Sequence, residues 1–271
     1  MGWDELTYST VPEGTVIMGW QGYGNAALKA AAKGHKFIMT PAKLLYLIRY
    51  QGPQWFEPLT YFGKNLMKDI YMYEPIQDDW EKGYSDLLIG VQASMWTEFC
   101  DNTDAVTYQI FPRLAALAEV AWGEKGRKDW DTFQMSLDNY LAHLDAKKIK
   151  YAKSMFNIQH KSVPTGEGLN IKLESERTDV EIRYTLDGTE PTYESVTYSD
   201  SLLIQESTVL KAAAFKNNVK MGQTLVLELK FNKATGKLIT GNNKDESLLT
   251  NGVRGSLRQS DFEWCTWGNH I

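Results

Sequence analysis

Two adjacent acidic residues, Asp4 and Glu5, lie beside a tryptophan at the start of the chain, in the run "MGWDEL". Neighbouring carboxyl groups can serve as general acid and base in a hydrolase when both reach the substrate. Trp3 offers a different chemistry, because an aromatic face binds the apolar face of another ring. The residues alone leave open whether the acid pair or the tryptophan is the functional feature.

A second combination of an aromatic and an acidic residue, Trp96 and Glu98, comes at the end of the apolar run 86–96. That run predicts a strand buried on both faces. Side chains two positions apart lie on the same face of a strand, so both would contact one ligand. Trp stacks on sugar rings and a carboxylate accepts hydrogen bonds from sugar hydroxyls. The nine Trp and fourteen Tyr fit carbohydrate binding, but their number alone favours core packing.

The composition excludes several other classes of protein. A net charge of −5 argues against a nucleic acid partner. The chain contains no apolar run long enough to span a membrane. Cys100 and Cys265 lie far apart, and the four histidines show no ligand spacing. We therefore expect no disulfide framework, no metal and no other cofactor.

The first part of the chain, to about residue 158, alternates short apolar runs with helical patterns. Gly34 is a natural end for the first helix, and Pro112 should kink the second or start a new one. The alternation predicts an α/β fold with a parallel sheet, either doubly wound or a barrel. The expected strands are 15–20, 35–40 and 86–96, and the expected helices are 25–34, 104–122 and 129–148. The last helix should bury one face formed by Trp130, Phe133, Leu137, Tyr140, Leu141 and Leu144.

The intervening segment 52–85 is long, aromatic and acidic, and we interpret it as a functional loop. Trp55, Tyr61 and Tyr73 would line outer parts of a binding site or pack on the sheet's rim. Asp78 and Asp79 are expected to be solvated.

From about residue 160 the pattern changes to short strands at regular spacing with turn signals between them. This pattern predicts a small all-β sandwich. The expected strands lie within 169–176, 180–188, 201–207, 208–217 and 223–232. The remaining forty or so residues are polar and too few for an independent core, so they indicate the start of a further module.

Four runs carry a specific resemblance to a known family: "GWDE" (2–5), "VIMGWQG" (16–22), "GVQASMWTE" (90–98) and "FPRLAALAEVAW" (111–122). In this order they closely resemble the β-N-acetylhexosaminidases of glycoside hydrolase family 20. The resemblance covers residues 1 to about 155 and implies a (β/α)8 barrel.

The later residues resemble the modules that accompany such barrels. "IRYTLDGTEPT" (182–192) resembles the small C-terminal β-sandwich of these enzymes, and "NNKDESLLTNGVRGS" (242–256) resembles the start of a galactose-binding-like module. The implied organisation is 1–158 for the C-terminal half of a barrel, 163–232 for the sandwich and 233–271 for a truncated module.

The resemblance implies five substrate-binding residues. Trp3, Trp20 and Trp96 match three tryptophans that wall the sugar pocket, and Tyr46 matches a tyrosine that hydrogen-bonds the acetamido group. Glu98 matches the carboxylate that binds the sugar O4 and O6 hydroxyls. One position departs from the family pattern. Where the family carries Tyr-x-Asp, this chain has Ile48, which cannot accept a hydrogen bond from a hydroxyl.

The resemblance also answers the question raised by the acid pair. Family members use substrate-assisted catalysis, in which the acetamido oxygen attacks the anomeric carbon. Their Asp-Glu pair lies on an earlier strand, so Asp4–Glu5 would only imitate it and no catalytic residue is assigned here. A barrel takes roughly 250 residues and roughly 155 precede the sandwich, so about four of eight strands would be present.

Three functional hypotheses follow from these patterns. The first is a β-N-acetylhexosaminidase polypeptide that lacks its acid/base pair, acts on glycans with terminal N-acetylhexosamine, and in full length is periplasmic or extracellular. The second is a non-catalytic carbohydrate-binding or interaction protein. The third is a structural accessory in which only the sandwich folds. In all three, Cys100 is expected to be buried and inert, and Arg113 to pair with Glu119 or a helix end.

Overall fold

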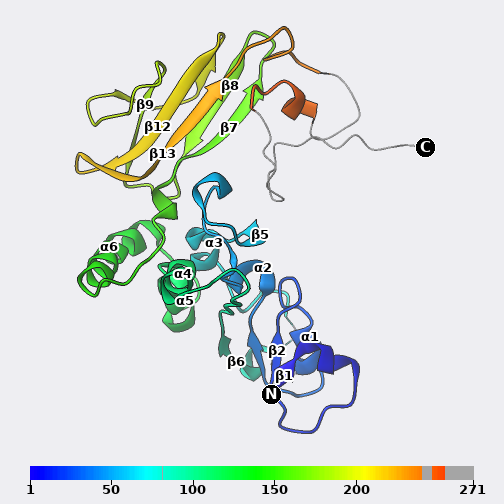
Figure 1. Ribbon diagram of the computed structural model, residues 1–271. Coiled ribbons are helices and arrows are strands. Elements are labelled where there is room, and N and C mark those ends of the chain that lie inside the picture. The colour runs from blue at the N-terminus through cyan, green and yellow to red at the C-terminus, as the bar shows by residue number, and fades with distance from the viewer. Residues whose placement is uncertain (81, 240–245, 254–271) are drawn as a thin grey trace. The chain divides into compact units, whose positions relative to one another are not determined.

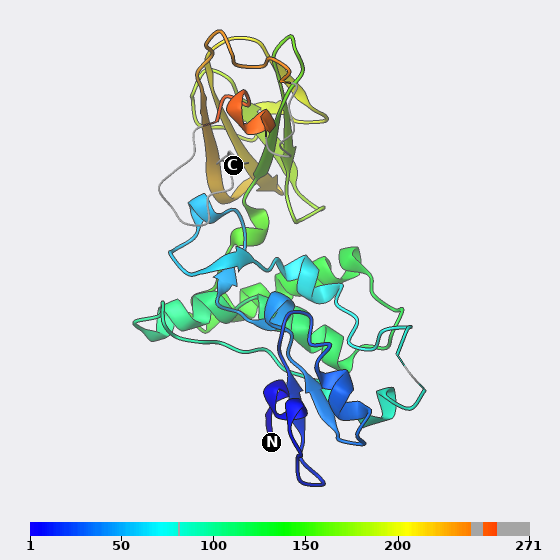
Figure 2. The same ribbon diagram turned by 90° about the vertical axis from the view of Figure 1, so that its right-hand side faces the viewer.

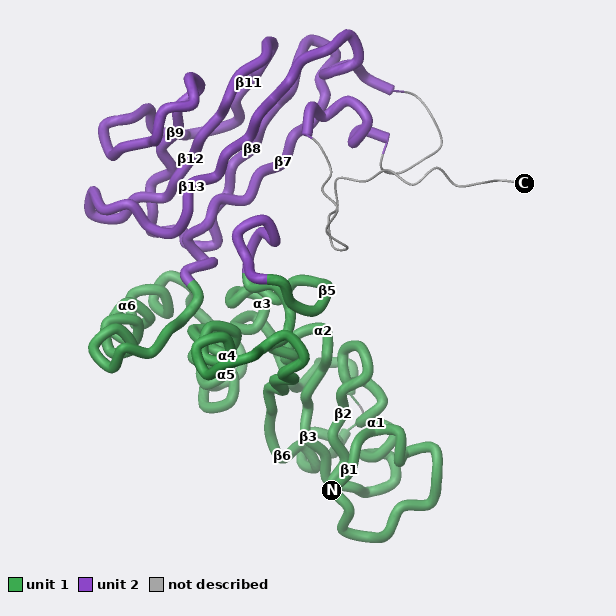
Figure 3. The backbone as a smooth tube through the Cα atoms, in the orientation of Figure 1, with its two compact units in different colours: residues 1–51, 59–152 green, residues 52–58, 153–271 purple. Residues whose placement is uncertain are grey.

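A computed structural model describes residues 1–80, 82–239 and 246–253. The chain forms two compact units (Figure 3). Unit 1 contains residues 1–51 and 59–152, and unit 2 contains residues 52–58 together with residues from 153 onward. Most of the predicted third module, 233–271, lies outside the described residues.

Unit 1 contains a four-stranded parallel sheet in the order β1-β2-β3-β6 (Figure 1). Its strands are β1 (Gly2–Trp3), β2 (Ile17–Gly19), β3 (Phe37–Met39) and β6 (Leu88–Val91). The predicted strands at 15–20 and 35–40 are thus confirmed, with shorter bounds. Figure 2 shows the short helix α1 (Ala27–Ala31) beside this sheet, where it packs on β2 and β3. The helix predicted over 25–34 is therefore present but spans only its middle.

The prediction for residues 86–96 is wrong in two respects. Strand β6 ends at Val91, and its side chains are only partly covered, with Ile89 55% exposed. Among the described strands of this sheet, β6 has a single neighbour, β3. Burial of a strand's two faces depends on the elements that cover the sheet, so an apolar run does not guarantee it.

The segment predicted as one long loop is mostly ordered into short elements. After β4 (Arg49–Tyr50) come η2 (Gln54–Phe56), β5 (Tyr61–Lys64), α3 (Met67–Tyr71) and η3 (Ser85–Leu87). Strands β4 and β5 pair in parallel. Residues 52–58 leave unit 1 and belong to unit 2. The segment is therefore not a single long loop, and its functional role stays a prediction.

The break predicted at Pro112 is confirmed. Helix α4 (Thr103–Ile110) begins at the Asn102 side chain, which accepts a hydrogen bond from the Ala105 N–H at 2.9 Å. The next helix, α5 (Arg113–Trp122), starts immediately after the proline. Proline cannot donate a backbone hydrogen bond, so it is tolerated only at a helix start.

Helix α6 (Trp130–Ala146) buries the apolar face expected from its sequence, except that Tyr140 is half-buried. The Asp129 carboxylate caps its first turn by accepting from two backbone N–H groups. Trp130 and Phe133 pack against Tyr71 of α3, with ring centroids 5.5 and 4.6 Å from it. These contacts join α6 to the rest of unit 1.

Arg113 is completely buried and organises the centre of unit 1. Its guanidinium donates to the carbonyl oxygens of Leu47 (2.7 Å), Arg49 (3.1 Å), Asn65 (3.2 Å) and Gln109 (2.7 Å). Gln109 lies at the end of α4, so the expected contact with a helix end is present. The four carbonyls belong to three separate stretches of chain, which Arg113 therefore holds together.

Unit 2 is built from two antiparallel sheets, which Figure 2 shows as two layers. One contains β7 (Gln159–Pro164), β8 (Leu169–Glu174) and β11 (Leu202–Ile204), in the order β11-β8-β7. The other has the order β10-β9-β12-β13 and contains β9 (Glu181–Thr185), β10 (Val196–Thr197), β12 (Thr208–Lys216) and β13 (Val219–Leu229). The described residues of unit 2 also form three short 3-10 helices, which are η2 in the segment 52–58, η4 (Ser154–Phe156) and η5 (Glu246–Leu249).

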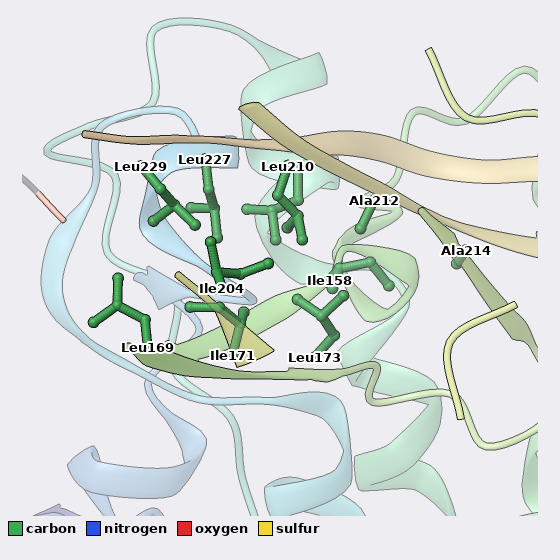
Figure 4. Packing of buried hydrophobic residues seen from close by; sticks show 11 residues of the cluster. Ile158, Leu169, Ile171, Leu173, Ile204, Leu210, Ala212, Ala214, Leu227 and Leu229 are labelled. Carbon is green, nitrogen blue, oxygen red and sulfur yellow. The ribbon is translucent and has the colours of Figure 1, made fainter. Parts of the chain in front are cut away.

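The core of unit 2 lies between these sheets (Figure 4). Leu169, Ile171 and Leu173 of β8 face Leu210 of β12 and Leu227 of β13. Apolar side chains that recur at every second position made five strands of this unit predictable, namely β8, β9, β11, β12 and β13. Strands β7 and β10 were missed, because "QHKSVP" lacks alternation and β10 has only two residues.

The segment 52–58 is anchored in unit 2 by specific contacts. The Phe56 carbonyl accepts from the Gln223 side chain at 3.1 Å, and the Phe56 ring packs on the core. The Trp55 ring lies 5.1 Å from the ring of His160. Burial lowers the pKa of His160 to about 4, so this histidine is neutral near pH 7.

Candidate sugar-binding site

Four of the five predicted site residues gather at the carboxyl end of the parallel sheet. Trp3 ends β1, Trp20 directly follows β2, Trp96 lies beyond β6, and Tyr46 follows α2 (Ala42–Leu45). Ring centroids are 6.3 Å apart for Trp3–Trp96, 6.0 Å for Trp20–Tyr46 and 6.3 Å for Tyr46–Trp96. Together these rings form a continuous aromatic cluster. In α/β folds, ligands bind at this end of the strands.

The backbone around Tyr46 and Trp96 is held by a parallel bridge between Tyr46 and Ser94. The Leu47 N–H donates to the Ser94 carbonyl at 2.8 Å, and the Ser94 N–H donates to the Leu45 carbonyl at 2.9 Å. These bonds place Trp96, two residues past Ser94, next to Tyr46. The pairing joins segments almost fifty residues apart, which a local pattern does not predict.

Two glycines allow the turn that presents Trp20. A Cβ atom added to Gly19 would lie 2.5 Å from the Ala27 Cβ and 2.8 Å from the Gly24 carbonyl oxygen. Gly24 adopts φ +84°, which favours glycine. The end of β2 therefore packs closely on the start of α1, and Trp20 leaves the sheet at a defined point.

Asp4 is buried and its carboxylate is fully engaged. It accepts hydrogen bonds from the backbone N–H groups of Trp20 (2.9 Å) and Gln21 (3.1 Å), and from the Gln21 side-chain amide (3.1 Å). Burial raises the pKa of Asp4, while these hydrogen bonds act in the opposite direction. The geometry is that of a structural acceptor rather than of an acid directed at a substrate.

Glu5 is exposed, and its carboxylate contacts the aromatic cluster directly. The indole N–H of Trp20 donates to both carboxylate oxygens, at 3.0 and 3.1 Å. Both members of the acid pair therefore act on Trp20, one at its backbone and one at its ring. Sequence reasoning missed this, because no short-range pattern connects residues 4 and 5 with residue 20.

Tyr46 is half-buried between Trp20 and Trp96. Burial raises the pKa of Tyr46, and the Trp96 side chain, which hydrogen-bonds it, acts the other way. Its hydroxyl is therefore neutral and remains a hydrogen-bond donor near pH 7.

Glu98 is exposed two residues beyond Trp96. Neither residue lies in a β-strand, so the argument that a strand would place both on one face is wrong. Trp96 is 43% exposed and therefore has a free ring surface. The role of Glu98 stays a prediction.

Ile48, at the position that departs from the family pattern, is buried with 6% exposure. Its carbonyl accepts from the Thr60 hydroxyl and from the Tyr61 N–H. The side chain at this position belongs to the core of unit 1 and offers no acceptor to a ligand.

Other residues considered from sequence lie away from the aromatic cluster. Tyr73 is buried, while Tyr61 is exposed and packs on Phe62 at 4.4 Å. Tyr73 lines a cavity of about 960 Å³ in unit 1, along with Arg49 and Trp80, and none of the four clustered aromatics lines it. This cavity is thus separate from the predicted site.

Two further expectations have clear outcomes. Cys100 is half-buried rather than buried, and burial raises the pKa of its thiol, which disfavours the reactive thiolate. Asp78 is solvated as predicted and forms an exposed ion pair with Lys125.

Among the described residues, no three acidic, histidine or cysteine side chains gather as they would around a metal ion. The described helices are also too short or too polar to cross a membrane.

The carboxyl end of a parallel sheet in an α/β fold is where active and ligand-binding sites are usually built. Comparison with known families gives two matches. Residues 1–125 match the model of glycosyl hydrolase family 20, catalytic domain. Residues 163–226 match the model of the chitobiase/beta-hexosaminidase C-terminal domain. The family resemblance seen in the sequence is thereby confirmed.

Individual relatives agree with this assignment. A beta-hexosaminidase of Porphyromonas gingivalis is 30% identical over 82% of this chain and 29% of its own length. A beta-N-acetylhexosaminidase of Cellulomonas fimi is 32% identical over 49% of this chain and 27% of its own. The family 20 beta-N-acetylhexosaminidase structure from Streptomyces coelicolor has a TM-score of 0.51 at 27% identity, covering 56% of this chain and 32% of that one. The chain spans less than a third of the length of these two curated relatives.

Proposed function

We propose that this chain supplies the aromatic wall of the sugar pocket of a β-N-acetylhexosaminidase, which releases terminal β-linked N-acetylhexosamine from glycans. The convergence of Trp3, Trp20, Tyr46 and Trp96 carries this proposal. Indole faces would stack on the apolar face of the sugar ring, and the Tyr46 hydroxyl would donate to the acetamido oxygen. The exposed carboxylate of Glu98 would accept hydrogen bonds from the O4 and O6 hydroxyls.

The proposed reaction is substrate-assisted hydrolysis with retention of configuration. The acetamido oxygen attacks the anomeric carbon while a general acid protonates the leaving oxygen, and water then opens the cyclic intermediate. Tyr46 would orient the acetamido group for this attack. We assign the general acid to neither Asp4 nor Glu5, because the first is buried on amide groups and the second binds Trp20.

The proposed architecture follows from the same family. Strands β1, β2, β3 and β6 would form part of a (β/α)8 barrel, within a catalytic region that spans 1–158. The two sheets of unit 2 would form a β-sandwich over 163–232, and residues 233–271 would begin a galactose-binding-like module. The names of the relatives support the substrate class, and a Streptomyces plicatus β-hexosaminidase was solved in complex with its product GlcNAc. The full protein would act in the periplasm or outside the cell.

One observation favours a second function, non-catalytic carbohydrate binding. Both carboxylates of the acid pair already have protein partners in this chain. A polypeptide that keeps the aromatic wall without an available acid would bind the sugar and not cleave it.

The test is to measure hydrolysis of 4-nitrophenyl N-acetyl-β-glucosaminide by the 271-residue chain, and GlcNAc binding by tryptophan fluorescence. We expect binding without hydrolysis, and about tenfold weaker binding for Trp96→Ala, because a stacking face is lost. Trp122→Ala is the matched control, since Trp122 is 90% exposed on α5. If the chain hydrolyses the substrate and Glu5→Gln abolishes this activity, Glu5 is the general acid. If the chain does not bind GlcNAc, the proposal that its aromatic cluster forms the wall of a sugar pocket is refuted.

A further inference from the structure

We propose that Glu5 is a positioning residue that fixes the orientation of the Trp20 ring in the aromatic cluster. This inference rests on the proposed function, in which Trp20 is one wall of the sugar pocket. It assigns a role to an acidic residue that resembled a catalytic acid in the sequence.

The geometry at the indole supports this role. Trp20 has one polar ring atom, Nε1, which lies 3.0 and 3.1 Å from the two carboxylate oxygens of Glu5. A shared contact of this kind constrains rotation of the ring about its own side-chain bonds. The ring held in this way lies nearly parallel to Tyr46, with an interplanar angle of 17°. The Trp20–Tyr46 wall therefore depends on where the Glu5 carboxylate lies.

The backbone of Trp20 is held from the same turn. Asp4 accepts the Trp20 N–H at 2.9 Å, and both acidic residues begin the 3-10 helix η1 (Asp4–Tyr8). The Trp20 carbonyl accepts from the Ala42 N–H at 2.8 Å on the other side. Of these three hydrogen-bonding contacts with Trp20, the one from Glu5 acts on its ring.

Burial explains why the effect should be on orientation rather than on stability. Glu5 is exposed and Trp20 is half-buried, and hydrogen bonds between exposed groups add little to folding. A ring at the mouth of a pocket loses rotational freedom when a ligand stacks on it. A carboxylate that restrains the ring beforehand reduces that cost, which is the general benefit of preorganisation.

The experiment uses the 271-residue chain labelled with ¹⁵N at its tryptophan indoles, with the Trp20 resonance assigned through Trp20→Phe. We expect Glu5→Ala to move the Trp20 indole proton upfield, toward the position of the exposed Trp122. Glu5→Gln keeps one acceptor oxygen and should give a smaller shift. Glu13→Ala, which removes another exposed carboxylate from the β1–β2 connection, is the matched control and should leave Trp20 unchanged.

GlcNAc affinity is then measured for the same variants by fluorescence. We expect Glu5→Ala to weaken binding about fivefold, Glu5→Gln to restore part of it, and Glu13→Ala to have no effect. An unmoved Trp20 resonance in Glu5→Ala would overturn the proposal. A moved resonance with unchanged GlcNAc affinity would also overturn it, because the contact would then not serve the site.

Failure of the proposed function has a different signature. If the wild-type chain does not bind GlcNAc, the sugar wall is refuted, while the Trp20 resonance still decides whether Glu5 orients the ring. Thermal unfolding of each variant, expected to match the wild type, shows that a loss of affinity does not come from a loss of fold.

Discussion

Among the described residues, each of the two units buries one arginine completely, yet the two arginines have different partners. In unit 1 the hydrogen bonds of Arg113 go to the carbonyl oxygens of Leu47, Arg49, Asn65 and Gln109. In unit 2 the side chain of Arg177, at 0% exposure, forms an ion pair with a carboxylate.

The unit 2 arrangement is a small charged network. Arg177 donates from Nε to one oxygen of Asp179 at 2.7 Å and from Nη2 to the other, which also binds the Lys216 ammonium. The guanidinium lies 5.1 Å from the ring centre of Phe156, an additional cation–π contact.

The difference follows from which acceptors lie near each guanidinium. Arg177 lies in the connection between β8 and β9, and Asp179 follows it by two residues in the same connection, so its carboxylate partner is local in the chain. Short, irregular stretches in unit 1 leave carbonyls unpaired, and a buried cation can satisfy several of them. Asp4 shows the same principle with opposite sign, since amide N–H groups of a loop satisfy a buried carboxylate.

The largest effect is expected when Arg113 is removed. Arg113→Met should destabilise unit 1 by about 3–5 kcal/mol, because it leaves several buried carbonyls without a donor. Arg113→Lys should recover little, since an ammonium cannot reproduce the planar fork. Urea unfolding followed by tryptophan fluorescence measures both variants. Arg127→Met, which removes an exposed arginine, is the control, and an equal loss there would contradict the role given to Arg113.

An intermediate effect is expected at Asp4. Asp4→Ala should cost about 2 kcal/mol, because the N–H groups of Trp20 and Gln21 lose their acceptor. Asp4→Asn keeps one acceptor oxygen and should cost less. Chemical denaturation of the two variants measures the difference. If Asp4→Ala leaves the free energy of unfolding unchanged, water replaces the carboxylate. The N–H groups of Trp20 and Gln21 would then not need Asp4 as an acceptor.

The smallest expected effect is the change in stability on acidification, which should have opposite sign in the two units. Burial would raise the pKa of Asp179, but Arg177 and Lys216 outweigh it and lower the pKa to about 2. The stabilisation from this ion pair is therefore present above pH 3.8, the ordinary value for Asp, and is lost as the pH falls toward 2. With its side chain 29% exposed, the loss should be about 1 kcal/mol.

The raised pKa of Asp4 predicts that its contribution to the stability of unit 1 changes with pH in the opposite direction. Its contribution becomes more favourable as the pH falls, because the folded state takes up the proton more readily than the unfolded state. Hydrogen exchange of amides in β12 and of amides in β2, followed from pH 5 to pH 3, separates the units. Asp179→Asn and Asp4→Asn should each flatten the pH dependence of their own unit only. If the stability of both units changed with pH in the same direction, the comparison between them would be contradicted.

Local patterns in the sequence were sufficient for the elements that make their own contacts. The alternation in β8, β12 and β13, the stripe on α6 and the helix break at Pro112 were all predictable, because each depends on residues a few positions apart. Elements without such a pattern were missed, among them β7 and the short strands and helices of 52–85. The extent of β6 was misjudged because burial depends on the neighbouring strands.

For the site, the sequence by itself determined which aromatic residues to consider and which family they indicate. Only the tertiary structure decided that Trp3, Trp20, Tyr46 and Trp96 meet, since parallel strands bring their carboxyl ends to one edge. It also decided what the acid pair does. Whether a carboxylate acts as an acid or as a hydrogen-bond acceptor depends on the groups that surround it, and the partners of Asp4 and Glu5 lie some fifteen residues away in the chain.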